Sequence, residues 1–303
     1  MKNCLLKKGL MVALVILLAF GARVMFGGKK AMAEMPFYRL NVGEIEQRAS
    51  FSTTYSKSSL ERKSNIKLAC KSINKYFLDV GAEFSFNRVV GARTEKRGYK
   101  RAKIIEKGKF VDGVGGGVCQ VSTTLYNAVL LAGLTVTECH PHSLPVSYVL
   151  PSFDAMVNSN SADLRFVNTS NYPVIIYANA DGEKLEISIW GEPLGATYER
   201  KSVVIEEIVA EKEEEIIDVN GEYPDLYQGE TKVLSYSKNG YKSEGYLIKK
   251  VNQIEESRVR IRRDSYMPQR GVVVLGTAER QEDTDGFYYF TIKERLLKYL
   301  GIN

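Results

Sequence analysis

The residues best suited to chemistry lie in one short run, "FVDGVGGGVCQVSTTLYNAVLLAGL", which spans residues 110–134. Here Cys119 follows a glycine triplet and opens a segment whose apolar spacing predicts a helix to about Ala132. A thiol in the first turn of a helix lies near unpaired backbone N–H groups and the positive end of the helix dipole, which lower its pKa. The pattern therefore indicates a nucleophilic thiolate. The alternative interpretation is a small core cysteine beside a tight turn.

The triplet consists of Gly115, Gly116 and Gly117, which have no side chains to shield the main chain. Another molecule can approach closely, so we expect their amides to point at an oxyanion that develops during reaction. We expect the polar residues after the thiol to border the same cleft and contact substrate. These residues are Gln120, Ser122 and Thr123. A thiol beside amide donors is the arrangement that acyl transfer needs.

A thiol nucleophile needs a base, and the chain has two histidines, His140 and His142, both in "ECHPHSLPVSY". Pro141 favours extended backbone at the residue before it, and residues two apart in an extended segment face the same side. We therefore expect both rings to face one cleft.

A third group usually orients the base in such sites. Asp154 in "SFDAMV" is the preferred candidate, with Asp163 and Asn168 as alternatives. Because Pro151 and Ser152 stand just before it, Asp154 also fits a purely structural role in a turn.

Metal and phosphate chemistry fit these residues less well. Zinc-binding atoms are present on Cys119, Cys139, His140 and His142, but the sequence lacks the closely spaced thiol pair of structural zinc sites. The run "GGGVCQVST" also lacks the lysine of a phosphate loop, so we expect neither a metal nor a cofactor. The basic loop "TEKRGYKRAKIIEKGK" is expected either to be solvated or to hold an anionic group such as a peptide carboxylate.

The elements that must position these residues follow from periodicity. Residues 62–81 show helical spacing that ends at Gly81, and "EFSFNRVVG" and "AKIIEKGKFV" are typical of short strands. After the cysteine helix, "PVSYVL", "ADLRFVN", "YPVIIYAN" and "KLEISIWG" predict strands of an antiparallel sheet. The predicted fold class is α+β, with the cysteine-bearing helix packed on a mostly antiparallel sheet, followed by a small all-β domain.

Four segments are expected along the 303 residues. Residues 1–34 form an export segment, and residues 35–198 form a catalytic domain with its own core, which is expected to fold without the next domain. Residues 199–278 form a β-rich domain whose strands are interrupted by glycines. Residues 279–303 form a tail in which "TIKERLLKYL" predicts a short amphipathic helix.

The N-terminus predicts export, because Lys2, Lys7 and Lys8 precede the apolar residues 9–22. The "AMA" at residues 31–33 matches a cleavage site but lies far from the apolar run, so a retained single-span membrane anchor is preferred to a cleaved signal. Either interpretation places the rest of the chain outside the cytoplasm. The net charge of +6 is mild and dispersed, so nucleic acid is not an expected partner.

The three cysteines beyond the export segment are Cys70, Cys119 and Cys139. Because three is odd, at least one thiol must stay free, and a Cys70–Cys139 disulfide is left open.

Five stretches resemble the VanW-like domain family and together cover about residues 50–192: "FSFNRVVGARTEKRGYKRA", "GGGVCQVSTTLYNAVLLAGL", "HPHSLPVSYV", "FDAMV" and "DLRFVNTSNYPVII". The GGGxCQxST block belongs to the core pattern of that family. Residues from about 200 to 277, which close with "RIRRDSYMP" and "VLGT", are similar to the G-five (G5) domain, a β-rich extracellular module.

The resemblance implies an L,D-transpeptidase that cross-links peptidoglycan stem peptides through a cysteine thioester, with a second domain that binds wall glycan. It assigns the nucleophile to Cys119 and the base to His142, which precedes a serine, with His140 as the lesser candidate. Cys139 stands where many family members have arginine, so no role is implied for it. Two alternatives are kept: a non-catalytic wall-binding or scaffolding protein, and a cysteine hydrolase of stem peptides.

Overall fold

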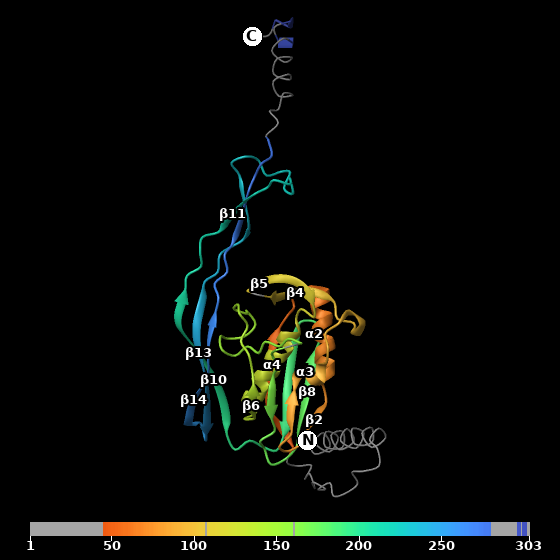
Figure 1. Cartoon of the computed structure of the whole chain (residues 1–303), viewed down its shortest axis with the longest axis vertical. Helices are drawn as coiled ribbons and strands as arrows, with labels where there is room; N and C mark the ends of the chain where they lie inside the picture. The colour runs from red at the N-terminus through yellow and green to blue at the C-terminus, as the bar shows by residue number, and fades with distance from the viewer. Residues whose placement is uncertain (1–44, 107, 160, 280–295, 298, 302–303) are drawn as a thin grey trace. The chain divides into compact units, whose positions relative to one another are not determined.

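A computed structural model describes most of the chain beyond residue 44 (Figure 1). The predictions for residues 1–34 and for most of the C-terminal helix lie outside the described residues. Within them, no helix is both long and apolar enough to cross a membrane. The described residues are 45–106, 108–159, 161–279, 296–297 and 299–301.

Contacts within the chain define two compact units, of which the first combines Met1–Ile208 with Gly240–Met267. Its described elements, in chain order, are β1 (Glu46–Thr54), α2 (Leu60–Ile73), β2 (Tyr76–Leu78), β3 (Glu83–Ser85), α3 (Phe86–Val90), the 3-10 helix η1 (Glu95–Arg97), β4 (Arg101–Glu106), β5 (Lys109–Val114), α4 (Val118–Leu131), β6 (Thr135–Glu138), β7 (Arg165–Val167), β8 (Val174–Ala180), β9 (Lys184–Gly191), β10 (Thr197–Ile208), β13 (Gly240–Val251) and β14 (Ile254–Tyr266). The unit boundary therefore differs from the sequence-based boundary at residue 198, because β10, β13 and β14 join the first unit.

The strands of the first unit pair in antiparallel fashion. The main sheet has the order β1-β9-β8-β2, a smaller sheet has the order β3-β7-β6, and β4 pairs with β5 as a hairpin. The third sheet, β10-β13-β14, is built from strands of 12 and 13 residues and is called the ribbon below. Asn252 and Gln253 connect β13 to β14 with positive φ angles of 50° and 67°, as a tight hairpin turn requires.

The second unit combines Val209–Asn239 with Pro268–Asn303. Its described strands are β11 (Glu214–Ile217), β12 (Thr231–Ser235) and β15 (Val272–Leu275), in the order β11-β15-β12. β15 pairs in parallel with β11 and antiparallel with β12. Together with the ribbon, these strands confirm the prediction that the C-terminal domain is all-β.

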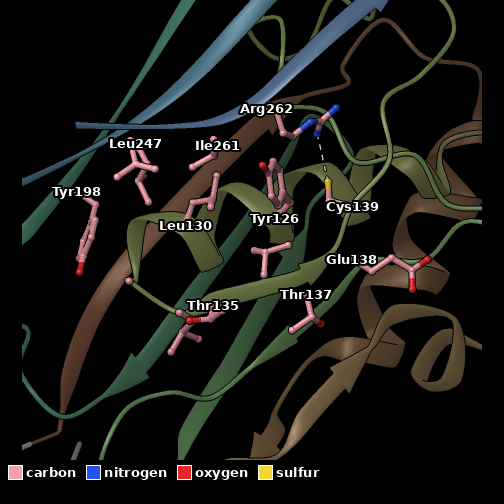
Figure 2. Close-up of a pocket in the computed structure, with 14 residues that line it drawn as sticks. Tyr126, Leu130, Thr135, Thr137, Glu138, Cys139, Tyr198, Leu247, Ile261 and Arg262 are labelled. Carbon is pink, nitrogen blue, oxygen red and sulfur yellow. Dashed lines mark hydrogen bonds between the residues drawn. The ribbon is translucent and has the colours of Figure 1, made fainter. Parts of the chain in front are cut away.

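A cavity of about 500 Å³ lies in the first unit beside the C-terminal half of α4 (Figure 2). Tyr126 and Leu130 line it from α4, and Leu247 and Ile261 line it from the ribbon. The space between α4 and the ribbon is therefore only partly filled by these apolar side chains.

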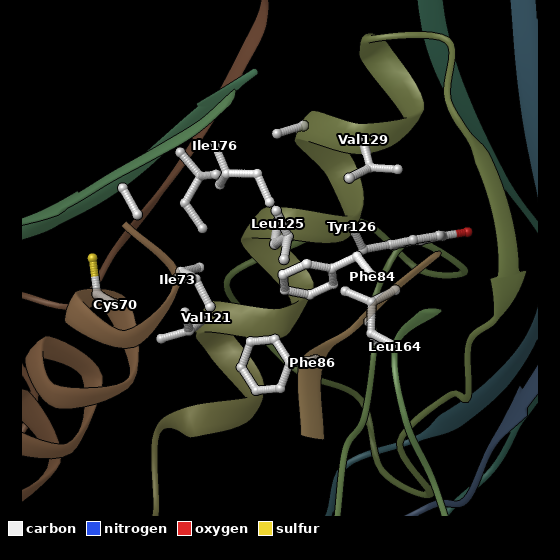
Figure 3. Close-up of a cluster of buried hydrophobic side chains, with 14 of the residues drawn as sticks. Cys70, Ile73, Phe84, Phe86, Val121, Leu125, Tyr126, Val129, Leu164 and Ile176 are labelled. Atoms are coloured by element: carbon white, nitrogen blue, oxygen red, sulfur yellow. The ribbon is translucent and has the colours of Figure 1, made fainter. Parts of the chain in front are cut away.

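Helix α4 occupies the centre of the main core, with most of its residues buried and with contacts to β1 and β9 (Figure 3). Leu125 and Val121 pack there with Phe84 and Phe86, and Phe84 stacks on Phe166 at 4.8 Å between ring centroids. A helix buried on every side must satisfy its polar side chains internally. Gly133 ends the helix with a φ of 68°, as its sequence position predicted.

Three predicted elements are wrong in part. The helix expected over residues 62–81 ends at Ile73, because Lys75 takes a φ of 60° and the chain continues as β2 in the main sheet. In "EFSFNRVVG" the strand is limited to β3, and Ser85 then caps α3 by accepting a hydrogen bond from the Arg88 amide. The strand expected at residues 145–150 is an irregular loop.

Candidate active site

Three of the predicted site residues come together in the structure: Cys119, His142 and Asp154. His142 Nδ1 lies 2.7 Å from Asp154 Oδ2, and the same oxygen accepts a hydrogen bond from the His142 amide at 2.6 Å. The His142 ring also interacts electrostatically with the side chain of Cys119. The result is a thiol, an imidazole and a carboxylate in series, the arrangement of a nucleophile, its base and the group that orients the base.

Cys119 is the second residue of α4, and Gly117 is the N-cap with a φ of 107°. Its Sγ lies 3.3 Å from the carbonyl oxygen of Val157. Burial of the thiol opposes ionisation, but the interaction with the His142 imidazolium outweighs burial, with a further contribution from Arg93. The pKa of Cys119 is therefore lowered, which favours the thiolate.

His142 and Asp154 are buried, with side chains that are 5% and 1% exposed. Burial alone would lower the pKa of His142, but the hydrogen bond of its ring to Asp154 and the interaction of its ring with Cys119 raise it to about 9. Burial would raise the pKa of Asp154, whereas the hydrogen bond and charge of His142 hold it below its usual range. At neutral pH these shifts favour a thiolate–imidazolium pair beside an ionised carboxylate.

The prediction that Ser122 and Thr123 contact substrate is wrong, because both side chains are fully buried against the segment that carries Asp154. Ser122 Oγ donates to the Ala155 carbonyl at 2.6 Å, and Thr123 Oγ1 accepts from the Ala155 amide at 2.9 Å. These hydroxyls fix the chain next to Asp154 on α4, so their role is structural.

The prediction that Gln120 contacts substrate is wrong for the same reason. Its Nε2 donates to Thr53 Oγ1 and to the Thr54 carbonyl, both at 2.9 Å, and its side chain is buried. Gln120 thus ties the start of α4 to β1 and has no access to a substrate.

The glycine triplet packs closely against neighbouring backbone, and not all of its amides are free to bind an oxyanion. A Cβ on Gly116 would lie 2.7 Å from the Lys103 carbonyl oxygen on β4, which excludes any side chain there. The Gly115 amide donates to the Lys100 carbonyl at 3.1 Å, so the predicted oxyanion role of Gly115 is wrong. Gly116 and Gly117 keep that role as a proposal.

The other candidates from the sequence lie outside this group. His140 pairs through Nε2 with Glu138 Oε1 at 3.0 Å and its side chain is 39% exposed, so the two histidine rings do not share one site. Asp163 accepts from Ser85 Oγ at 2.6 Å and caps α3. Asn168 Nδ2 donates to the Leu78 and Tyr172 carbonyls. These residues hold loops in place, and Asp154 alone meets the base.

All three cysteines in the described part of the chain are unpaired. Burial raises the pKa of Cys70 and of Cys139 to about 12. Cys139 lies 3.2 Å from Arg262 Nη1 at the edge of the cavity described above (Figure 2). That cavity is lined by none of the three site residues, so it is separate from the site around the thiol.

Sequence reasoning missed two arginines near the nucleophile. Arg62 on α2 and Arg93 after α3 both interact electrostatically with Cys119. Arg62 Nη1 donates to Ser58 Oγ at 2.9 Å, and Arg93 Nη1 donates to Asn87 Oδ1 at 2.7 Å, so both guanidinium groups donate these hydrogen bonds to neutral oxygens. Arg93 directly precedes the basic loop "TEKRGYKRAKIIEKGK", and this local excess of positive charge was the sequence feature that could have pointed to it.

Comparison with known proteins gives two family matches. Residues 61–190 match the model described as VanW like protein, and residues 199–278 match the G5 domain. The chain is 42% identical over 145 residues to "Uncharacterized protein YoaR" of Bacillus subtilis (strain 168), covering 48% of each chain. It is 30% identical over 126 residues to "Vancomycin B-type resistance protein VanW" of Enterococcus faecalis (strain ATCC 700802 / V583), covering 40% of this chain and 46% of that protein. The chain therefore spans about half the length of these relatives.

Two solved structures match part of the chain. One, "IgA1 Protease G5 domain structure", is 26% identical, with a TM-score of 0.18, and the match covers 28% of this chain and 92% of that one. The other, "Crystal structure of HP0197-G5", is 20% identical, with a TM-score of 0.15, and the match covers 27% of this chain and 97% of that one.

Proposed function

We propose that this chain, which carries a VanW-like domain followed by a G5 domain, is a cell-wall enzyme that cross-links peptidoglycan stems by L,D-transpeptidation. The observation that carries the chemistry is the Cys119–His142–Asp154 arrangement at the start of α4. The substrate class follows from the family resemblance, and the name of one relative connects it with vancomycin resistance. The export segment, residues 1–34, would place the enzyme outside the cytoplasm on a membrane anchor, and the G5 domain would bind wall glycan.

In the first half-reaction, the Cys119 thiolate attacks the carbonyl carbon of the diamino-acid residue in a tetrapeptide stem. The carbonyl electrons move to oxygen, where the amides of Gly116, Gly117 and Cys119 would stabilise the charge. When the intermediate collapses, the C–N bond breaks and the His142 imidazolium gives its proton to the departing D-alanine nitrogen. A thioester remains on Cys119, and His142 is neutral.

In the second half-reaction, the side-chain amine of another stem attacks the thioester. Neutral His142 takes the amine proton, the C–S bond breaks, and the thiolate–imidazolium pair is restored. Asp154 stabilises the imidazolium and keeps the ring oriented in both halves, which is the role a buried carboxylate plays behind a catalytic histidine.

Arg62 and Arg93 give the proposed site a preference for an anion beside the thiol. A stem whose terminal D-alanine is the leaving group carries a carboxylate close to the attacked bond. Guanidinium groups bind carboxylates through charge-assisted hydrogen bonds. We therefore assign that terminal carboxylate to these two arginines.

The variant Arg93→Gln should raise the KM for a soluble tetrapeptide stem by about tenfold, as expected for one charge-assisted hydrogen bond. A stem with an amidated C-terminus lacks the carboxylate, so its KM with the wild type should be raised to a similar extent. Its KM should not rise further in Arg93→Gln. Arg97→Gln is the matched control, because Arg97 donates to the Ala92 carbonyl and is exposed. An unchanged preference for the free acid in Arg93→Gln would contradict the assignment.

Transpeptidation itself is tested by incubating the purified full chain with disaccharide tetrapeptide fragments and identifying products by mass spectrometry. We expect a cross-linked dimer that has lost one D-alanine, and no product with Cys119→Ala. A free tripeptide stem in place of the dimer would instead establish a hydrolase. Binding to wall fragments without any product would leave the scaffolding alternative.

A further inference from the structure

We infer that the ribbon is part of the catalytic centre, in which Tyr266 and Arg262 of β14 are positioning residues that hold Asp154 against His142. This inference rests on the proposed function of the site. It goes beyond that function by placing residues of the G5 match, residues 199–278, directly behind the catalytic carboxylate.

The two oxygens of Asp154 are held from opposite sides. Oδ2 meets His142, whereas Oδ1 accepts a hydrogen bond from Tyr266 Oη at 2.5 Å and lies 3.6 Å from Arg262 Nη2. The main chain is held as well, because Arg262 Nη1 donates to the Asp154 carbonyl. A carboxylate held at both oxygens and at its own backbone cannot rotate away from the imidazole.

The Tyr266 hydroxyl is itself oriented. It accepts a hydrogen bond from the Ser152 amide at 2.8 Å, so its own proton must point elsewhere, and the acceptor 2.5 Å away is Asp154 Oδ1. An ionised carboxylate is an acceptor only, so this chain of donors favours the charged form of Asp154. Tyr266 is 1% exposed, which keeps water from competing for either contact.

The ribbon also fixes the loops that carry the base and the carboxylate. The amide of Met267, the residue that follows β14, donates to the Ser143 carbonyl at 2.8 Å, next to His142. Ser243 on β13 hydrogen-bonds through Oγ to Ser152 Oγ at 2.8 Å, two residues before Asp154. Ser152 has a φ of 63°, an unfavourable angle for serine that needs such support.

The choice of residue to change depends on the charges that surround it. Arg262 lies between Asp154 and Asp264, with its Nη2 3.1 Å from Asp264 Oδ2, so removing it would take the paired cation from Asp264 and leave His142 as the cation beside Asp154. Tyr266→Phe removes one hydrogen-bond donor and keeps the shape and the burial. This variant therefore tests positioning with little change in packing.

The test is the pH profile of Cys119 alkylation by iodoacetamide in the full chain, followed by peptide mass spectrometry. Without the Tyr266 donor, the negative charge at Asp154 is less compensated, which disfavours the nearby thiolate. The acid limb of the profile should therefore move to higher pH by about one unit, the shift equivalent to one hydrogen bond to a charged group. Tyr246→Phe is the matched control, because that ribbon hydroxyl donates to Glu244 instead of Asp154.

An acid limb that stays in place in Tyr266→Phe would overturn the inference, whether or not the melting temperature falls. If that variant does not fold, Arg262→Lys takes its place, since it keeps the charge but loses the paired contacts to Asp154 and Cys139. Alkylation needs no wall substrate, so the two proposals can fail separately. A shifted profile without cross-linked product would retain the positioning role and reject transpeptidation.

Discussion

Iodoacetamide should alkylate Cys119 at least ~100-fold faster than Cys70 or Cys139 in the folded protein at pH 7, because only the thiolate reacts. The pKa of Cys119 is lowered by His142, whereas burial raises the pKa of the other two to about 12. The measurement is the time course of modification at each cysteine, read from digested peptides by mass spectrometry.

Denatured protein provides the control, since unfolding should remove the difference and make the three rates similar. His142→Ala should slow Cys119 alkylation without changing the rates at Cys70 and Cys139. Equal rates in the folded state, or protection of Cys119, would show that the thiol is a core residue and not a nucleophile.

The second large effect concerns the base. His142→Ala should reduce turnover of stem peptides by about 10² to 10⁴, the usual cost of removing a general acid–base group. The imidazolium proton is lost as pH rises through about 9, so wild-type turnover should also decline above that pH, when the leaving amine is no longer protonated.

His140→Ala is the matched control for this variant. Its ring pairs with Glu138 at the surface, so most of the activity should remain. The reverse order of effects would move the role of base to His140 and would separate catalysis from the buried histidine–aspartate pair.

The sequence was sufficient to select three residues that the structure brings together, because their types are uncommon in this chain and their chemistry is complementary. Cys119 follows the glycines, His142 is one of only two histidines, and Asp154 was preferred among three candidates. Each choice relied on a feature that is local in the sequence: a helix start, a histidine pair and a nearby acidic residue.

The roles of the neighbouring residues were not predictable in the same way. Gln120, Ser122 and Thr123 look like cleft residues as long as α4 is imagined with one exposed face, but the structure surrounds the helix on every side. Their polarity serves β1 and the Asp154 segment. Burial of this kind depends on which strands cover the helix, and no local pattern in the sequence specifies that.

Tyr266 and Arg262 were missed for a related reason. They lie in a stretch that matches a different family model from the one containing Asp154, and nothing near them in the sequence points to catalysis. Only the inclusion of β13 and β14 in the first compact unit brings them to the carboxylate.

The contact between Tyr266 and Asp154 joins residues 112 positions apart, which has a consequence for the order of assembly. Contacts between distant residues close a long loop and form late in folding. A chain that has folded only through β9 already has its thiol and its imidazole, but the carboxylate between them and the ribbon is not yet fixed. If Cys119 is the nucleophile that we propose, we expect it to reach full reactivity only after β14 has docked on the Asp154 segment.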